Sequence, residues 1–467
     1  MVARQARREL VCLTQTAVFR RSKSCDEPTV DGLAVNPRRP AQRRGLMGAR
    51  GRRLRACPEC DRVVALPPLK PRERADCPRC HCVLVRRHRM PVQRGMAYAV
   101  AALATLITAV VLPFVGFEVR GIGQAIGLAD TASELVRHGA PLVGAIVFLG
   151  VVLLPAVYLV AFIVLHGRLV RQRRGRFDRT LARLIAAIDP WIMADVFVVG
   201  VLVSLTKIAG MARLDIGPAF WAYCAFVVLL LKTRLSLDGD WLWFRLAGEP
   251  KAPAGTQAGR DALPQGLTGC HACGLVNAID DHERCYCQRC GDRLHGRHPY
   301  SIQNTLALLV LAVILYIPAN ALPITHTVRF GASEASTIIG GVVSFLRAGD
   351  IPIAVVIFVA SVVIPLAKML ALVWLCGRAA WRFEARGLAW VRLYRVVEFI
   401  GRWSMVDVFV VAILVALIRA GSLMAISPGT AALAFAGMVI VSMMAAMTFD
   451  PRLLWRANSD AVQGQRL

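Results

Sequence analysis

Four pairs of cysteines, each with two residues between its members, are the clearest chemical signal in this sequence. They account for eight of the fourteen cysteines. The pairs are Cys57 with Cys60, Cys77 with Cys80, Cys270 with Cys273, and Cys287 with Cys290. Two such pairs place four soft thiolates on two tight turns, which is the ligand set of a tetrahedral structural zinc site. The sequence therefore predicts two zinc ribbons, each holding one ion.

One other reading of the cysteines stays open. Four-thiolate sites also bind iron, as rubredoxin-like centres do, and such iron would make the protein a membrane redox protein. We expect zinc in a closed structural role, because four cysteines leave no open coordination position and so short a ribbon cannot bury a core of its own.

A second candidate site consists of polar residues inside long apolar stretches. Ionisable side chains at membrane depth are costly and tend to face an interior cavity, where they pair. Asp195, Lys368 and Asp407 are such residues. Ser404 and Ser442 could supply hydroxyl groups to the same cavity. Lys368 is expected farther from the inner surface than Asp407, and its long stem could span the difference in depth. The two are therefore predicted to pair, in a proton-coupled or gating role. The alternative is that both aspartates cap their helices and that Lys368 extends toward the inner interface.

The elements that position these residues are predicted to be membrane-spanning helices. The hydrophobic content is 56%, and a helix needs about 20 apolar residues to cross a bilayer. Eight segments qualify: 95–115, 140–165, 191–212, 217–236, 302–322, 351–376, 403–420 and 427–447. The predicted fold class is an all-α polytopic membrane protein.

Positive charge predicts the orientation of these helices. Arginines gather in segments 166–190 and 377–402, whereas the opposite segments 116–139 and 323–350 balance fewer arginines with acids. Loops rich in Lys and Arg stay in the cytoplasm, so we expect both termini and both ribbons to be cytoplasmic. The outer segments are expected to hold short amphipathic helices or ordered loops.

The chain also repeats itself. Trp191-Ile-Met-Ala-Asp195-Val-Phe-Val-Val and Trp403-Ser-Met-Val-Asp407-Val-Phe-Val-Val lie 212 positions apart. Asp238 matches Asp450 and Trp243 matches Trp455 at the same separation. Tyr158 occupies the position that corresponds to Lys368. We therefore predict two tandem four-helix repeats, each preceded by a ribbon and inserted in parallel, with the second repeat carrying the working site.

Seven segments follow from this organisation. They are a disordered basic N-terminus (1–56), within which Met47 is a candidate start, zinc ribbon 1 (57–90), repeat 1 (91–245), a linker (246–268), zinc ribbon 2 (269–298), repeat 2 (299–456) and a C-terminal tail (457–467). The net charge of +26 is spread beside apolar segments, so a membrane surface explains it and no nucleic-acid partner is expected. No phosphate-binding loop or nucleophile elbow is present in the sequence, and we expect no enzyme activity.

Taken together, these motifs resemble the paraquat-inducible protein A family over residues 57 to 456. The resemblance is carried by both ribbons, the two Trp-x-Met-x-Asp motifs, Ile317-Pro-Ala-Asn-Ala-Leu-Pro323 and Phe449-Asp-Pro-Arg-Leu-Leu-Trp455. The first repeat departs from it, with Leu112-Pro-Phe-Val-Gly-Phe-Glu118 at the position of the Pro-Ala-Asn motif.

The resemblance implies a function that composition and spacing do not. It implies an inner-membrane protein of a Gram-negative cell that works beside a periplasmic mammalian-cell-entry domain protein. The pair would move phospholipids or other lipophilic molecules between the two membranes. It also implies zinc in the ribbons and a polar network that includes Lys368, Ser404, Asp407 and Ser442.

Overall fold

The computed structural model describes residues 53 to 455 apart from short gaps. The gaps are residues 89, 120–121, 129, 131–132, 134–140, 173–174, 209–212, 280–284, 295–299, 330–331, 348, 350, 382–386, 418 and 421–423. The predicted N-terminal segment up to residue 52 and the predicted C-terminal tail lie outside the described residues.

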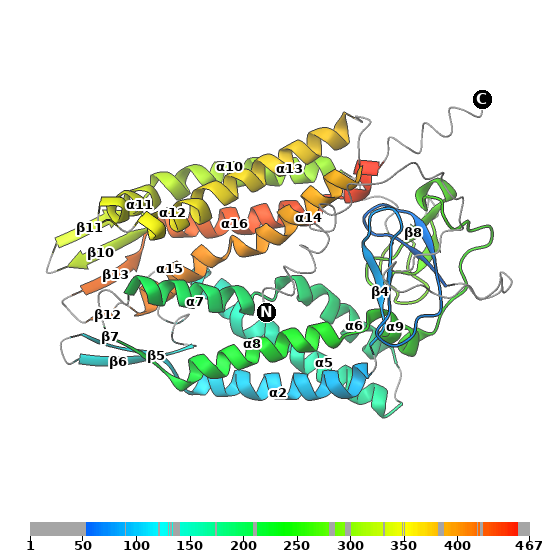
Figure 1. Ribbon diagram of the computed structural model, residues 1–467, viewed down its shortest axis with the longest axis horizontal. Coiled ribbons are helices and arrows are strands. Elements are labelled where there is room, and N and C mark those ends of the chain that lie inside the picture. The colour runs from blue at the N-terminus through cyan, green and yellow to red at the C-terminus, as the bar shows by residue number, and fades with distance from the viewer. Residues whose placement is uncertain are drawn as a thin grey trace, which may run out of the picture.

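Helices make up most of the described chain and form two units, which ribbon 2 separates in the sequence (Figure 1). The first unit, residues 91–247, contains α2 (Pro91–Val111), α4 (Pro141–Phe148), α5 (Leu154–Val170), α6 (Arg176–Ile188), α7 (Ala194–Ile208), α8 (Pro218–Ser236) and α9 (Gly239–Ala247). The second unit, residues 301–455, contains α10 (Ser301–Ala321), α11 (Ile338–Arg347), α12 (Ile351–Phe358), α13 (Ile364–Ala380), α14 (Gly387–Trp403), α15 (Val406–Leu417) and α16 (Thr430–Thr448).

Short turns join several of these helices. The π-helical turns are η1 (Leu149–Leu153) and η4 (Val359–Val363), and the 3-10 turns are η2 (Asp189–Trp191), η3 (Leu263–Gln265) and η5 (Pro451–Trp455). Each π-helical turn ends just before a proline, Pro155 or Pro365, at the start of the next helix. A proline has no backbone N–H to donate, and a wider turn accommodates the interrupted hydrogen-bond ladder.

Seven helical stretches in the described residues are long and apolar enough to cross a membrane. They correspond to seven of the eight predicted spans and identify a multi-pass membrane protein. The remaining span, predicted at 403–420, is represented by the 12 residues of α15. The eighth crossing therefore stays a prediction.

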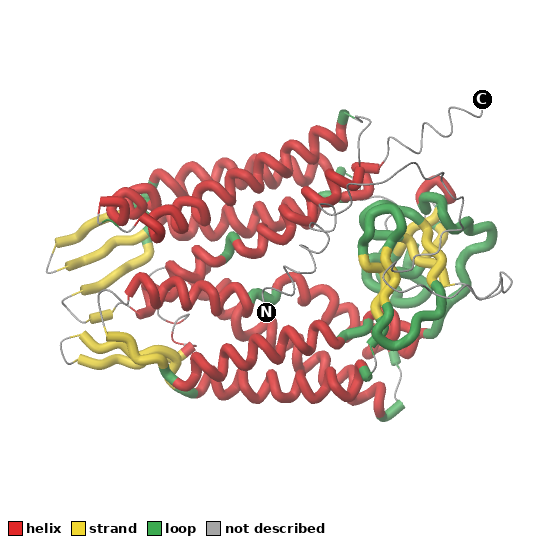
Figure 2. The backbone as a smooth tube through the Cα atoms, viewed as in Figure 1, coloured by secondary structure: helices red, strands yellow, loops and turns green. Residues whose placement is uncertain are grey.

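The expectation of an all-α fold is wrong at one end of the molecule, where two small sheets cap the helices (Figure 2). The three-stranded sheet has the order β6-β5-β7, with β5 (Pro113–Val119), β6 (Ile122–Gly127) and β7 (Arg213–Ile216). The four-stranded sheet has the order β11-β10-β13-β12, with β10 (Thr325–Arg329), β11 (Ala332–Ser336), β12 (Arg419–Ala420) and β13 (Met424–Pro428). In the second unit, α11 follows its hairpin and confirms the short helix expected there.

Two glycines allow these sheets to join the helices. Gly217 and Gly429 each precede a helix, and a Cβ atom at these positions would lie 2.2 Å from the Pro113 oxygen and 2.0 Å from the Pro323 oxygen. Backbone approaches this close exclude any side chain. The same contact thus recurs at the start of α8 and of α16.

The opposite end of the molecule carries both ribbons (Figure 1). Their strands are β1 (Arg53–Ala56), β2 (Val63–Leu66), β3 (Arg74–Asp76), β4 (Val83–Arg86), β8 (Leu267–Gly269) and β9 (Val276–Ala278). Residues 53–56, placed by the sequence in a disordered N-terminus, instead pair with β2. The N–H of Val63 donates to the oxygen of Arg260 at 2.8 Å, so the predicted linker contacts ribbon 1.

The two units meet along α7 and α15. Phe197 and Phe409 pack edge to face with ring centroids 5.5 Å apart. Gly200 lies beside them, where a Cβ atom would be 3.0 Å from the Cβ of Phe409. We call this contact the seam. It is built from the two helices that carry the Trp-x-Met-x-Asp motifs.

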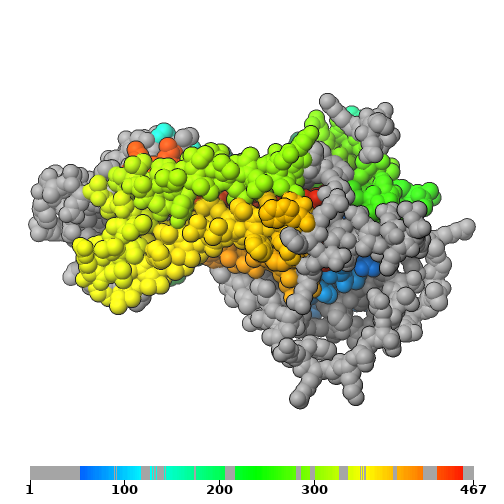
Figure 3. Space-filling model, turned by 90° about the horizontal axis from the view of Figure 1, so that it is seen from above, coloured from blue at the N-terminus to red at the C-terminus, as the bar shows by residue number. Residues whose placement is uncertain are grey.

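Helix faces turned away from the seam are apolar and exposed. On the second unit they include Val310, Ile314 and Ile317 of α10 and Leu370, Val373 and Trp374 of α13. Figure 3 shows the second unit as one continuous surface built from these helices and their neighbours. A broad apolar exterior of this kind suits the hydrocarbon of a bilayer rather than water.

Candidate metal centres and buried polar site

Each ribbon brings its four cysteines together in a buried cluster. Within either set, the four sulfur atoms all lie within 4.8 Å of one another. The shortest separations are 3.4 Å between Cys57 and Cys80 and 3.4 Å between Cys270 and Cys290. Ligand sulfurs of a tetrahedral zinc site are about 3.8 Å apart, because each Zn–S bond is about 2.3 Å long. The two clusters therefore fit a metal ion bound by four sulfurs.

A shared turn geometry aims the sulfurs of each pair at a common point. The residue after the second cysteine has a positive φ in all four turns, and its N–H donates to the carbonyl of the first cysteine at 2.8–3.0 Å. These residues are Asp61 (φ 62°), His81 (φ 60°), Gly274 (φ 70°) and Gly291 (φ 72°). Glycine adopts this conformation without strain, and Asp and His tolerate it better than most residues.

Hydrogen bonds among the four thiols of a cluster shift their pKa values in opposite directions. The pKa is raised for Cys57, Cys60, Cys80, Cys270 and Cys273 and lowered for Cys77, Cys287 and Cys290. Hydrogen bonds from neighbouring thiols, that of Cys57 first, lower the pKa of Cys77 far below its usual value. In ribbon 2 the same effect, from Cys270 first, lowers the pKa of Cys287. A thiolate is the form that binds metal. Each cluster could thus hold one ion, whose four sulfur ligands would leave no position for a substrate.

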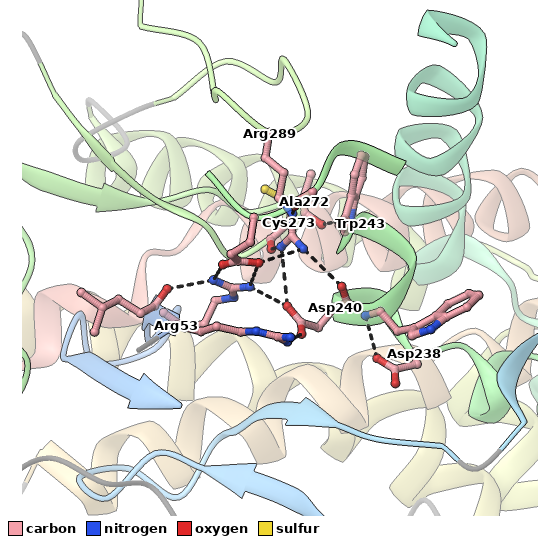
Figure 4. Close-up of polar contacts among 12 residues, drawn as sticks. Arg53, Asp238, Asp240, Trp243, Ala272, Cys273 and Arg289 are labelled. Carbon is pink, nitrogen blue, oxygen red and sulfur yellow. Dashed lines mark hydrogen bonds and ion pairs between the residues drawn. The ribbon is translucent and has the colours of Figure 1, made fainter. Parts of the chain in front are cut away.

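A buried network of two arginines and two carboxylates joins the ribbons to the end of the first unit (Figure 4). Arg55 of β1 contacts Asp240 of α9 at 2.6 Å and Glu249 at 2.5 Å. Arg289, between the cysteines of ribbon 2, lies 3.5 Å from Asp240 and 3.2 Å from Glu249. Its side chain is fully buried. Both ribbons are therefore held to the end of the first unit by shared carboxylates.

Burial and neighbouring charges shift the pKa values of this network in opposite directions. Burial alone would raise the pKa of Asp240, but the positive charge and hydrogen bond of Arg55 outweigh it and lower that pKa. Burial likewise acts to lower the pKa of Arg55, and the hydrogen bonds and charges of Glu249 and Asp240 raise it instead. The network is thus ionised, and each charge depends on its partners.

The second candidate site is centred on Lys368 of α13. Its side chain is buried, with a residue exposure of 3%, and its ammonium donates to the Ser442 hydroxyl of α16 at 3.0 Å. Ser442 in turn donates to the Val439 carbonyl. The backbone of α14 passes close by, since a Cβ atom on Gly401 would lie 3.2 Å from the Lys368 nitrogen. Three helices of the second unit therefore enclose this cation.

The other predicted polar residues are Ser404, Asp195 and Asp407, each at or near the end of a helix. Ser404 is buried just beyond α14, and its hydroxyl donates to the Ile400 carbonyl at 3.4 Å. Asp195 is half-buried in the first turn of α7, where the helix dipole favours a negative charge. Asp407 occupies the matching place in α15, but its side chain lies outside the described residues. The predicted pairing of Lys368 with Asp407 stays a prediction.

The first unit has a different residue at the matching position. Tyr158 is fully buried and stacks on Phe162 with ring centroids 6.3 Å apart. It follows the first π-helical turn as Lys368 follows the second. A buried tyrosine and a buried lysine thus lie at matching places after the two π-helical turns.

Sequence reasoning missed the residues that hold the ribbons in place. Arg395 contacts Glu59, Trp455 packs beside the first cysteine cluster, and Trp243 donates to the Ala272 carbonyl at 3.0 Å. The signal for Trp243 and Trp455 was present, because they match at 212 positions. This match was interpreted only as evidence of an internal repeat, because the sequence around a tryptophan does not indicate which surface its side chain covers.

Comparison with known proteins gives a consistent result. The family model described as Paraquat-inducible protein A matches residues 92–247 and 302–459. The "Intermembrane transport protein PqiA" of Escherichia coli K12 is 40% identical over 399 residues, covering 85% of this chain and 94% of the relative.

Two more distant relatives extend the match. The "Lipophilic envelope-spanning tunnel protein A" of the same strain is 28% identical, covering 86% of this chain and 91% of the relative. A "Probable intermembrane transport protein" of Haemophilus influenzae is 27% identical, covering 86% and 95%. No solved structure matches the chain significantly. With its family model matched in both units, the chain belongs to the paraquat-inducible protein A family.

Proposed function

We propose that this protein is the inner-membrane component of an intermembrane lipid transport system. It passes phospholipids or other lipophilic molecules to or from a periplasmic tunnel of mammalian-cell-entry domains. The printed names of the relatives, "intermembrane transport protein" and "lipophilic envelope-spanning tunnel protein", support this role. Those names describe transport proteins, which agrees with a protein that is not an enzyme.

The observation that carries the proposal is the buried cation of the second unit. Lys368 lies within a stretch apolar enough to cross the membrane and donates to Ser442. Keeping an ammonium at such a depth costs free energy, so its presence points to a polar or charged molecule that reaches it. The phosphate of a lipid headgroup has the complementary charge. Ser404 and Asp407 complete the site in this proposal, and Asp195 is the first unit's counterpart of Asp407.

The proposed topology has eight crossings in two tandem four-helix repeats. In it, the ribbons and both termini face the cytoplasm and each ribbon holds a structural zinc ion. The two sheets then face the periplasm, at the end of the molecule away from the ribbons (Figure 2). The concentration of arginine near the ribbon end supports this orientation. The periplasmic partner would meet the chain at the sheets.

A photoreactive phospholipid tests the role of the buried cation. We expect cells fed this lipid to give adducts on α13, α14 and α16 near Lys368 after irradiation, mapped by mass spectrometry. The Lys368→Met variant should lose these adducts, while lipid labelling of the apolar exterior near Trp221 should persist in both proteins. Exterior labelling alone in the unaltered protein would contradict the proposal.

A further inference from the structure

Ribbon 1 docks on the second unit, although the chain continues from it into the first. Arg395 of α14 forms an ion pair with Glu59 and donates to the Cys80 carbonyl at 2.8 Å. Trp455 of η5 packs against the cysteine cluster, and the Arg79 guanidinium lies 4.4 Å from the centre of its ring. The cysteine turns of ribbon 1 are therefore in direct contact with the second unit.

Ribbon 2 makes the reciprocal contact with the first unit, although the chain continues from it into the second. Trp243 of α9 donates to the Ala272 carbonyl at 3.0 Å, within the first cysteine turn. Arg183 of α6 donates to the Gly291 carbonyl at 3.5 Å, and Arg289 donates to the Gly248 carbonyl at 3.0 Å. Figure 4 shows Trp243, Ala272 and Arg289 in this interface.

The two interfaces use matching residues. Arg183 and Arg395 are 212 positions apart, as are Trp243 and Trp455. In both interfaces an arginine donates to a carbonyl at the second cysteine turn, and a tryptophan lies beside the cysteines. The cysteine turns of each ribbon therefore dock, in a quasi-symmetric way, on the unit that does not follow that ribbon in the chain, while β1 of ribbon 1 also contacts Asp240 of the first unit.

The ribbons also contact each other, and this contact completes a link between the two units. Arg55 of ribbon 1 forms a β-bridge with Leu275 of ribbon 2. Apolar side chains from both sides form a shared cluster made of Ala56, Val63, Ala262, Leu267 and Val276. A continuous layer across the ribbon end thus contacts both units.

Away from the ribbons, the seam joins the units by small apolar contacts. A polar contact crosses it as well, since the Ser204 hydroxyl of α7 donates to the Val410 carbonyl at 3.4 Å while also donating within its own helix. Apolar packing between two helices permits small rotations. At the ribbon end of the molecule, the ribbon layer restricts these rotations.

We propose that the exchanged ribbons form a metal-dependent clasp that fixes the ribbon ends of the two units relative to each other. A four-cysteine ribbon without its metal cannot fold, because it has no core of its own. Loss of metal therefore removes the surface on which Trp455 and Arg395, or Trp243 and Arg183, are docked. The units then separate at the ribbon end while the seam holds the rest. This mechanism does not depend on which molecule the protein carries.

Distance measurements between spin labels test the clasp in the full chain in nanodiscs. Labels on unnatural amino acids at Leu184 of α6 and Ala389 of α14, both exposed, report the ribbon end. Labels at Leu202 of α7 and Leu433 of α16 report the region farther from the ribbons. On chelation of the metal we expect the first distance to lengthen and broaden and the second to keep its value. An unchanged first distance, or equal change in both, would overturn the clasp.

A variant that keeps all the cysteines separates docking from metal binding. Trp455→Ala should retain two metal equivalents and lengthen the first distance. Trp221→Ala, which removes a tryptophan from the exposed face of α8, is the matched control and should leave both distances unchanged. If Trp455→Ala, with both metals bound, gave the unaltered distance, docking on the opposite unit would not hold the units together.

Discussion

Lys368 shows how a single residue can be unfavourable for folding and retained for function. Its burial beside Ser442 leaves the ammonium with a neutral partner in the described residues. Replacing buried charges by apolar groups of similar size is often neutral or stabilising. We therefore expect Lys368→Met to keep or raise the melting temperature of the purified protein and to abolish lipid transfer in cells.

Two measurements at equal protein levels check this prediction, the melting temperature and the movement of labelled phospholipid between membranes. Lys232→Met is the matched control, because Lys232 is exposed near the end of α8. It should leave both quantities unchanged. Full lipid transfer by Lys368→Met would remove this residue from the transport site.

Asp240 illustrates the opposite case, a charge retained for structure. It contacts Arg53, Arg55 and Arg289, and its side chain is 6% exposed. Asp240→Asn leaves buried arginines with one carboxylate fewer, which typically costs about 3 kcal/mol. The melting temperature should fall clearly. Asp189→Asn removes a carboxylate that is 42% exposed beside Arg234 and should lower it much less. Equal effects would show that burial of the network contributes little.

At the scale of elements, the sequence predicted the apolar helices well and the sheets not at all. The predicted spans 217–236 and 302–322 agree with α8 and α10 to within a residue, because long apolar runs signal a helix locally. Strand β5 pairs with β7, nearly a hundred residues away, and such pairing has no local signal. Helices α6 and α14 were missed because they are amphipathic and rich in arginine.

The glycines that join sheet to helix make a prediction at this scale. Gly217→Ala and Gly429→Ala each place a methyl group about 2 Å from a proline carbonyl, a distance at which the backbone must move. We expect either substitution to reduce the yield of monodisperse protein strongly. Gly239→Ala, at the start of α9, meets nothing within 4 Å and should behave like the unaltered protein. Normal folding of both Gly217→Ala and Gly429→Ala would show that the backbone near the proline carbonyls can move to accept the methyl group.

At the scale of the whole molecule, the exchange of ribbons lay beyond sequence reasoning. The cysteine spacing predicted each cluster, and the motif separation of 212 predicted the matching units. Tertiary contacts, such as that of Arg395 with Glu59, determine which unit each ribbon covers. The positions of the charged residues and tryptophans in the sequence are compatible with docking on either unit. The predicted linker could have joined the domains loosely, yet its Arg260 carbonyl accepts a hydrogen bond from Val63 of ribbon 1.

Metal content decides between the structural and the redox readings for the whole chain. Two closed four-sulfur clusters predict two equivalents of metal, and zinc would leave the protein colourless, whereas iron would give visible absorption. Cys270→Ser with Cys273→Ser should lower the content to one equivalent and reduce the melting temperature, because ribbon 2 covers the end of the first unit. Replacing Cys376, a buried cysteine outside both clusters, by Ala is the control and should leave two equivalents. Two equivalents of iron with a visible band would instead favour electron transfer, and the thiolate clusters would then be the working sites rather than supports.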